Sequence, residues 1–291
     1  MSFACGLFGI DRQVYYRSLR RCRHRRTVAD QVVEMVKVLR KVQPRIGVRK
    51  LYFLLYEPLR KLKIGRDRFF DILRANTLLI TPKRTYHVTT FSHHRFRKHP
   101  NLVKNLQITH PEQVWAADIT YIGKRDKPCY LSLITDAYSK KIVGYHVSDS
   151  LSSAGSIQAL KMAHKHRTNK ASRPIHHSDR GIQYCCEQYQ YLLNKYAFRC
   201  SMTQDSDPYE NAVAERVNGI LKQEFMIDSY HLELSLMRKI VSEAIGIYNE
   251  QRPHWSNHML TPVKMHAQHQ VRMRTYKQKT VADRSQLLFK V

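Results

Sequence analysis

The chain has 291 residues, of which 43% are hydrophobic, so it is long enough for a folded core and about two domains. No run reaches the ~18 consecutive apolar residues of a membrane helix, and the apolar start at 1–10 lacks the flanks of a secretory signal, so we expect a cytoplasmic protein. The 50 Lys and Arg against 23 Asp and Glu give a formal net charge of +27. This excess implies a polyanionic partner, but charge alone does not separate DNA from ribosomal association or from a merely soluble basic protein.

The six cysteines form no Cys-x-x-Cys pair, so in a reducing compartment we expect free, partly buried thiols. The 16 histidines are weak evidence for zinc, because structural zinc sites need ligands paired at short, fixed spacing. We therefore expect neither disulfide bonds nor structural zinc.

Residues 1–20 read as a short helix pair, with Asp11 as a possible helix cap. The pair is typical of a helix-turn-helix whose reading helix would carry Arg12 and Arg17, although a plain helical hairpin fits nearly as well. A separate helix is predicted over 27–41, where apolar residues fall on one face, and the Pro-Arg-Ile-Gly stretch at 44–47 ends it.

A second helix-turn-helix candidate follows, with a helix over 48–59 and another from Gly65 through Leu73. Arg66 and Arg68 would contact DNA phosphates, and a solvated helical face is the alternative. We interpret 1–80 as a helical DNA-binding region and 81–110 as a basic linker. That linker either follows the DNA or simply connects the two parts.

From residue 111 the pattern changes to alternating strands and helices, which we take as one catalytic core over 111–270, followed by a basic tail over 271–291. Short connections predict that the first three strands form an antiparallel meander. The order βββαβαβα indicates a mixed α/β fold with helices on both faces of one sheet. The predicted strands are 114–122, 129–136, 141–148, 174–178 and 199–203, and the predicted helices are 152–166, 187–196, 211–225 and 232–251.

Two aspartates stand where a sheet would present ligands. Asp118 lies inside an apolar strand, where a carboxylate is costly unless a cation or an arginine compensates it. Asp179 ends the fourth strand, and carboxyl ends of strands in α/β sheets face the ligand crevice, although an Asp-x-Gly turn is the plain alternative. Asp136 is a rival to Asp118, but its position at a strand end favours a turn or cap.

Glu215 is the third candidate, on the predicted helix 211–225. Its helical spacing places several polar residues on the same face, and one of them, a lysine two turns away, could reach a phosphate. An ordinary solvent-facing helix is the alternative, and Glu210 and Glu224 are rival acids. The companions on this face are Asn211, Asn218, Gly219 and Lys222.

The motifs around these acids carry a resemblance. The block 114–222 resembles the RNase H-like integrase core of DDE transposases and retroviral integrases, and more closely the second-frame (orfB) transposase of bacterial insertion sequences of the IS-three family. The matching motifs are Trp115-x-x-Asp118-Ile119-Thr120-Tyr121, His177-Ser178-Asp179-Arg180-Gly181-x-Gln183-Tyr184, Asn211-Ala212-x-Ala214-Glu215, Leu221-Lys222-x-Glu224 and Tyr248-Asn249-x-x-Arg252-Pro253-His254.

The resemblance implies a fold, a reaction and a cofactor. The fold would be a mixed five-stranded sheet flanked by helices, preceded by a small all-α region. Asp118, Asp179 and Glu215 would hold two Mg²⁺, with Mn²⁺ able to substitute, and would cleave and transfer DNA strands at insertion-sequence ends. Lys222 and Asn218 would position the phosphate near the terminal bases.

The resemblance also implies partners. These are the terminal inverted repeats, target DNA and the upstream orfA product, usually as a frameshift fusion, within a homo-oligomer on the synapsed DNA. No long heptad array is visible, so we expect the chain to lack the family's leucine-zipper module. A non-catalytic DNA-binding protein and a structure-specific nuclease of the same fold remain the alternatives.

Overall fold

A computed structural model describes residues 2–81, 98–123, 128–204 and 211–268. Its centre is a five-stranded sheet in the order β3-β2-β1-β4-β5, in which the first three strands are antiparallel and β4 and β5 run parallel to β1. The strands are β1 (Val114–Ile122), β2 (Cys129–Asp136), β3 (Ile142–Ser148), β4 (Ile175–Ser178) and β5 (Arg199–Met202). The predicted meander and the five-stranded mixed sheet are confirmed.

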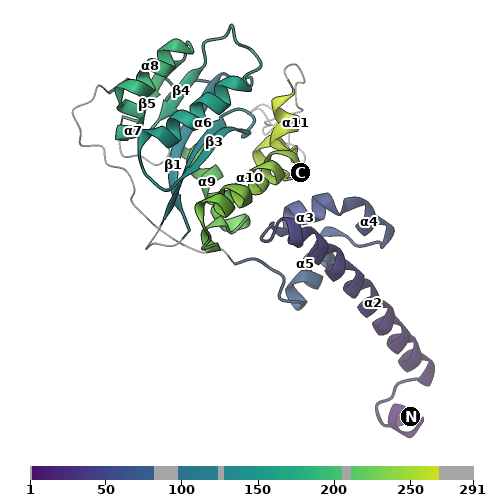
Figure 1. The fold of residues 1–291 in the computed structure, drawn as a ribbon. Helices are drawn as coiled ribbons and strands as arrows, with labels where there is room; N and C mark the ends of the chain where they lie inside the picture. Colours follow the sequence, from purple (N-terminus) through teal and green to yellow (C-terminus); the bar gives the residue numbers. More distant parts are fainter. Residues whose placement is uncertain (1, 82–97, 124–127, 205–210, 269–291) are drawn as a thin grey trace, which may run out of the picture.

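Helices cover both faces of the sheet, as Figure 1 shows. Because strand residues alternate between faces, Trp115 and Ala117 of β1 pack in one core cluster with α6 and α8, while Ile122 packs in the other with α9 and α10. Asp118 has the parity of Ile122 and therefore faces α9. These helices are α6 (Ser153–Lys165), α7 (Ile182–Cys185), α8 (Glu187–Lys195), α9 (Ala212–Glu224) and α10 (Leu234–Glu250), followed by α11 (Pro262–His266).

The N-terminal region corrects one prediction. The helix predicted over 27–41 is not separate: it continues the second helix of the N-terminal pair, so that α1 (Ser2–Leu7) is followed by the single 31-residue helix α2 (Arg12–Val42). No glycine or proline interrupts 12–42, and Asp11 caps the helix by accepting from the Gln13 N–H at 2.6 Å. The helix pair expected in 1–20 is thus present, but its second helix continues through 27–41, and Figure 1 shows the first half of α2 extending away from the core.

The second helical region folds around its own apolar cluster, built from the last part of α2 and three further helices. The predicted helix over 48–59 is divided at Leu55, and a turn ending at Gly65 precedes the last helix. The exposed Arg66 and Arg68 lie in the first turn of that helix. The three helices are α3 (Val48–Leu54), α4 (Tyr56–Lys61) and α5 (Arg66–Ala75).

Two further expectations were tested by the structure. All six cysteines are free thiols, as predicted. Across the described ranges, no helix combines the length and apolar character needed to cross a bilayer.

A buried polar cluster fastens α11 to the sheet. His266 Nδ1 lies 2.9 Å from Ser139 Oγ and 3.7 Å from Asp136 Oδ1, and its Nε2 lies 3.9 Å from Glu112 Oε1. Burial lowers the pKa of His266, but the two carboxylates outweigh it and raise this pKa above 6.5. Burial conversely raises the pKa of Glu112, yet His266 and the Asn169 and Thr168 N–H groups bring it down to about 2.

The cluster predicts a pH-dependent stability. A histidine with a raised folded pKa stabilises the fold fully below pH 6.5, and this contribution is lost as pH rises through the folded pKa. The Glu112 contribution is present above pH 4.5 and is lost as pH falls toward 2. We expect the urea unfolding free energy to fall as pH rises above 6.5, and His266→Asn to flatten this fall. His231→Asn, at an exposed histidine, is the control, and an unchanged slope in His266→Asn would contradict the assignment.

Candidate active site

Asp118 lies half-buried on β1 and points at α9. Its Oδ2 accepts a hydrogen bond from Asn218 Nδ2 at 2.7 Å, and its Oδ1 accepts from the Ile119 N–H at 2.9 Å. Burial, then the charge of Asp179 and finally that of Glu215 raise the pKa of Asp118 to about 7, against the two hydrogen bonds. A carboxyl group with so high a pKa carries a charge that its surroundings do not compensate.

Asp179 is brought to the same edge of the sheet by the strand register. Ala116 of β1 pairs with His177 of the parallel strand β4, and continuing that register by two residues sets Asp118 level with Asp179. Asp179 Oδ1 accepts from the Gly181 N–H at 3.0 Å, so the Asp-x-Gly turn, which was the alternative to a ligand role, is present. A Cβ at Gly181 would lie 3.0 Å from that oxygen, which explains the glycine. The turn orients the carboxylate and leaves it within electrostatic reach of Asp118.

Glu215 lies in the first turn of α9, with an exposed side chain whose pKa is raised by partial burial. It acts on Asp118 more weakly than Asp179 does, so the two aspartates form the close pair and Glu215 stands at its margin. Among the described residues, no three Asp, Glu, His or Cys side chains lie close enough together to form a ready-made metal group. The donor set still suits a hard divalent cation, since all three ligands are oxygens and a cation would relieve the repulsion between the aspartates.

Two of the polar residues that helical spacing placed on one face with Glu215 contact β1. Asn211 Nδ2 donates to the Ala117 carbonyl at 3.1 Å, and Asn218 holds Asp118. The Oδ1 atoms of both asparagines are buried without a hydrogen-bond partner in the described structure. Lys222 is partly buried, which lowers its pKa against the charges of Asp228 and Asp118. Asn218 therefore contacts a carboxylate here, whereas the sequence suggested a phosphate.

The rival acids have structural partners. Glu224 accepts from Arg252 Nε at 2.9 Å and Nη2 at 2.7 Å, and from Lys50 Nζ at 2.8 Å. Burial raises the pKa of Glu224, but these two cations lower it below its usual value. Asp136 is fully buried and accepts from the Glu112 and Ser139 N–H groups, as its expected turn role requires. Glu210 lies outside the described residues.

The arginines chosen for DNA contact are not part of the carboxylate site. Arg12 and Arg17 are exposed on the first half of α2, where Arg17 donates to Gln13 Oε1 at 2.9 Å. Arg66 donates to Asp67 Oδ1 at 2.9 Å with its side chain 72% exposed. These residues remain accessible for a ligand that extends beyond the core.

Two features escaped the sequence analysis. Tyr184, a buried residue of the short helix α7, has its pKa raised by burial, then by the charges of Tyr189 and of both aspartates, so it lies within electrostatic reach of the carboxylates. The Glu224–Arg252–Lys50 ion pairs were also missed. Their members are separated by 28 and 174 positions, and no local pattern reveals such pairs.

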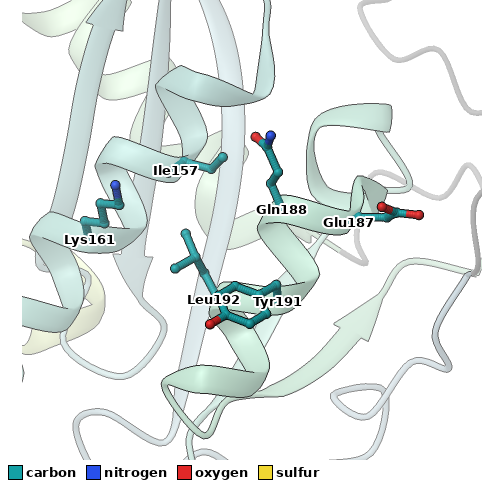
Figure 2. A pocket seen from close by; sticks show the side chains of 6 residues that line it. All are labelled: Ile157, Lys161, Glu187, Gln188, Tyr191 and Leu192. Atoms are coloured by element: carbon teal, nitrogen blue, oxygen red, sulfur yellow. The ribbon is translucent and has the colours of Figure 1, made fainter.

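One hollow of the described surface is not lined by the carboxylates. That hollow, of about 400 Å³, lies between the outer sides of α6 and α8 (Figure 2). Its walls come from the helices on the face of the sheet opposite to α9. A carboxylate site with the exposed Glu215 at its rim suits a polymer that lies across the surface better than an enclosed small molecule. The residues that line the hollow are Ile157, Lys161, Glu187, Gln188, Tyr191 and Leu192.

Comparisons with known proteins place this site in a family. Two models described as "Integrase core domain" match residues 108–208 and 196–262. A 31 kDa protein of insertion element IS600 from Shigella sonnei is 32% identical over 254 residues, which cover 86% of this chain and 92% of that protein. The transposase InsF of insertion sequence IS3A from Escherichia coli is 30% identical over 184 residues, 62% of this chain and 64% of that transposase.

Retroviral structures are more distant. The magnesium-bound catalytic core of HTLV-2 integrase is 18% identical with a TM-score of 0.43, and it covers 54% of this chain and 97% of its own. A simian T-cell lymphotropic virus intasome chain is 19% identical with a TM-score of 0.46, covering 79% of this chain and 77% of its own. The five-stranded sheet carries two acidic positions side by side on neighbouring strands. Together with the integrase-domain models and the insertion-element relatives, this shows that the chain belongs to the IS-three family of insertion-sequence transposases with an integrase core.

Proposed function

We propose that this chain is a transposase that cleaves DNA at the ends of its insertion sequence and joins those ends to target DNA. The observation that carries the proposal is the coupled pair of Asp118 and Asp179 on neighbouring parallel strands, with Glu215 facing them from α9. Two carboxylates held at one edge of the sheet, whose mutual repulsion a divalent cation would relieve, are the arrangement that metal-dependent phosphoryl transfer requires.

Asp118, Asp179 and Glu215 would hold two Mg²⁺, or Mn²⁺ in their place. When bound, such ions supply Lewis acidity and lower the pKa of an attacking water or DNA 3′-hydroxyl. Glu215 would close the site from its margin, because it is the most exposed of the three acids. Asn218 fixes the orientation of Asp118, and Lys222 places a positive charge beside the same carboxylate, where a scissile phosphate would lie.

The rest of the chain would hold the DNA. Under this proposal 1–80 binds DNA, 81–110 is a basic linker, 111–270 is the catalytic core and 271–291 is a basic tail. Arg66 and Arg68 at the start of α5, with Arg12 and Arg17 on α2, would contact phosphates. The partners would be the terminal inverted repeats and target DNA at the bacterial nucleoid, the upstream orfA product and further copies of this chain.

A strand-transfer assay tests the proposal. End-labelled duplex carrying the terminal repeat from the flanking DNA is incubated with target plasmid, the protein and Mg²⁺, with and without the upstream product. We expect cleaved ends and joined products that disappear when the metal is chelated, and none from a scrambled end. Binding without cleavage would identify a non-catalytic DNA-binding protein, and cleavage that never yields joined product would identify a nuclease.

A further inference from the structure

Trp255 is displayed on the surface. Of the two tryptophans in the chain, Trp115 is fully buried, whereas Trp255 is 66% exposed. Tryptophan is largely buried in most folded proteins, because its ring is the largest apolar side chain. An exposed tryptophan on an ordered segment therefore indicates a contact surface.

The loop that carries Trp255 is tightly anchored. Trp255 begins the short 3₁₀ helix Trp255–Asn257, and the His254 N–H donates to the Leu260 carbonyl at 3.0 Å. Asn257 is fully buried and donates to the Ser139 carbonyl at 2.6 Å. The ring is thus presented by a braced turn between buried neighbours, which reduces the conformational entropy lost when a ligand stacks on it.

The surroundings of the ring are strongly cationic. The Arg49 guanidinium carbon, on α3, lies 5.6 Å from the centre of the Trp255 ring. The adjacent His254 has its pKa lowered to about 3, by burial first and then by the charges of Arg252, Lys140, Lys50 and Arg216. Glu224 is the acid of this region, and its oxygens are already occupied by Arg252 and Lys50.

We propose that Trp255, together with Arg49, is a stacking platform for an unpaired base of a DNA strand. An aromatic face set among arginines fits a ligand that carries both a π-system and a negative backbone, and it repels a cationic partner. The inference rests on the proposed function, which supplies DNA as the substrate.

The position of the platform gives it a role near the reaction. Glu224 lies nine residues after Glu215 on α9, which corresponds to about 14 Å along the helix. Its partners Arg252 and Lys50 are close in sequence to Trp255 and Arg49, so the platform lies near this end of α9. A base held there would belong to the strand being processed or to its separated complement, about four stacked nucleotides from the reacting phosphate. The platform would keep the end of the duplex open.

Tryptophan fluorescence tests this platform on the full-length protein. Because Trp115 is buried, we expect single-stranded oligonucleotide to quench the emission of Trp255, and Trp255→Phe to lose the quenching while keeping most of the affinity. Trp255→Ala should weaken single-strand binding about tenfold or more, with a much smaller effect on fully paired duplex. Tyr191→Ala, at an aromatic residue of α8 that is 64% exposed, is the matched control and should change neither.

Three outcomes would overturn the inference. The platform is wrong if single strands leave the emission unchanged, or if Trp255→Ala binds them like the wild type. It is also wrong if Trp255→Phe and Trp255→Ala weaken duplex and single strands equally, which would indicate a general effect on the protein. Strand transfer by the wild type on paired ends is measured separately. If the platform fails while strand transfer is seen, the transposase proposal still stands. If quenching is seen but strand transfer is absent, only the transposase proposal is rejected.

Discussion

Asp118→Asn is expected to reduce strand transfer by about a thousandfold or more while leaving the protein folded. The substitution removes the central carboxylate of the proposed metal site, and losing about 4 kcal/mol of transition-state stabilisation corresponds to this factor. The new amide oxygen can still accept from the Ile119 N–H, and its NH2 group can donate to the Oδ1 of a flipped Asn218 side chain. The measurement is the rate of joined-product formation with saturating Mg²⁺, and Asp179→Asn and Glu215→Gln should lose activity in the same way.

The stability of the same variant separates a catalytic role from a structural one. Burial and the charge of Asp179 both disfavour the ionised form of Asp118. An uncharged amide at this position should therefore keep or raise the melting temperature. Asp136→Asn should do the opposite, since that buried carboxylate accepts three hydrogen bonds and lies beside His266. Asp149→Asn, on an exposed loop residue, is the neutral control. Full strand transfer by Asp118→Asn would show that the triad assignment is wrong.

The sheet was predictable from sequence because its strands are apolar runs separated by short turns. The antiparallel meander follows from those short connections, and the parity of Asp118 within β1 follows from the two-residue period of a strand. The two helices predicted in 1–20 and over 27–41 were not joined because the stretch 21–26 between them is exposed, basic and without apolar periodicity. The stretch stays helical because no glycine or proline interrupts it, and it gives no apolar periodicity because none of its side chains is buried.

The site was partly predictable, for a physical reason. Spacing on one helix predicted that Asn211, Asn218 and Lys222 share a face with Glu215, and in the structure the two asparagines bond to β1. Spacing did not show that Glu224, on the same helix, is held by cations from two distant segments, because long-range ion pairs leave no periodic trace. Glu224 is excluded as a metal ligand by its tertiary contacts, because its oxygens already bind Arg252 and Lys50.

Glu224→Ala is expected to destabilise the protein by about 3–5 kcal/mol, because it leaves a buried arginine unpaired. The Arg252 side chain is 2% exposed, and Glu224 at 18% is its bidentate partner. The same carboxylate binds Lys50 of α3, and the backbone carbonyl of Glu224 accepts from the Arg45 N–H at 3.0 Å. One residue therefore joins the N-terminal helices to the end of α9. The free energy is measured by urea unfolding, and Glu243→Ala on the exposed side of α10 should change it by less than about 0.5 kcal/mol.

The cause of that loss can be isolated by removing the whole charge group. If desolvation of an unpaired arginine dominates, then Glu224→Leu combined with Arg252→Met and Lys50→Met should recover most of the stability, since apolar side chains of similar volume often replace a buried ion pair at little cost. If the triple variant is as unstable as Glu224→Ala, the net attraction of the ion pairs holds the fold instead. Strand transfer adds a second measurement. A triple variant that is stable but inactive would mean that this charge group is needed to align α9, and with it Glu215 and Asn218, for the reaction.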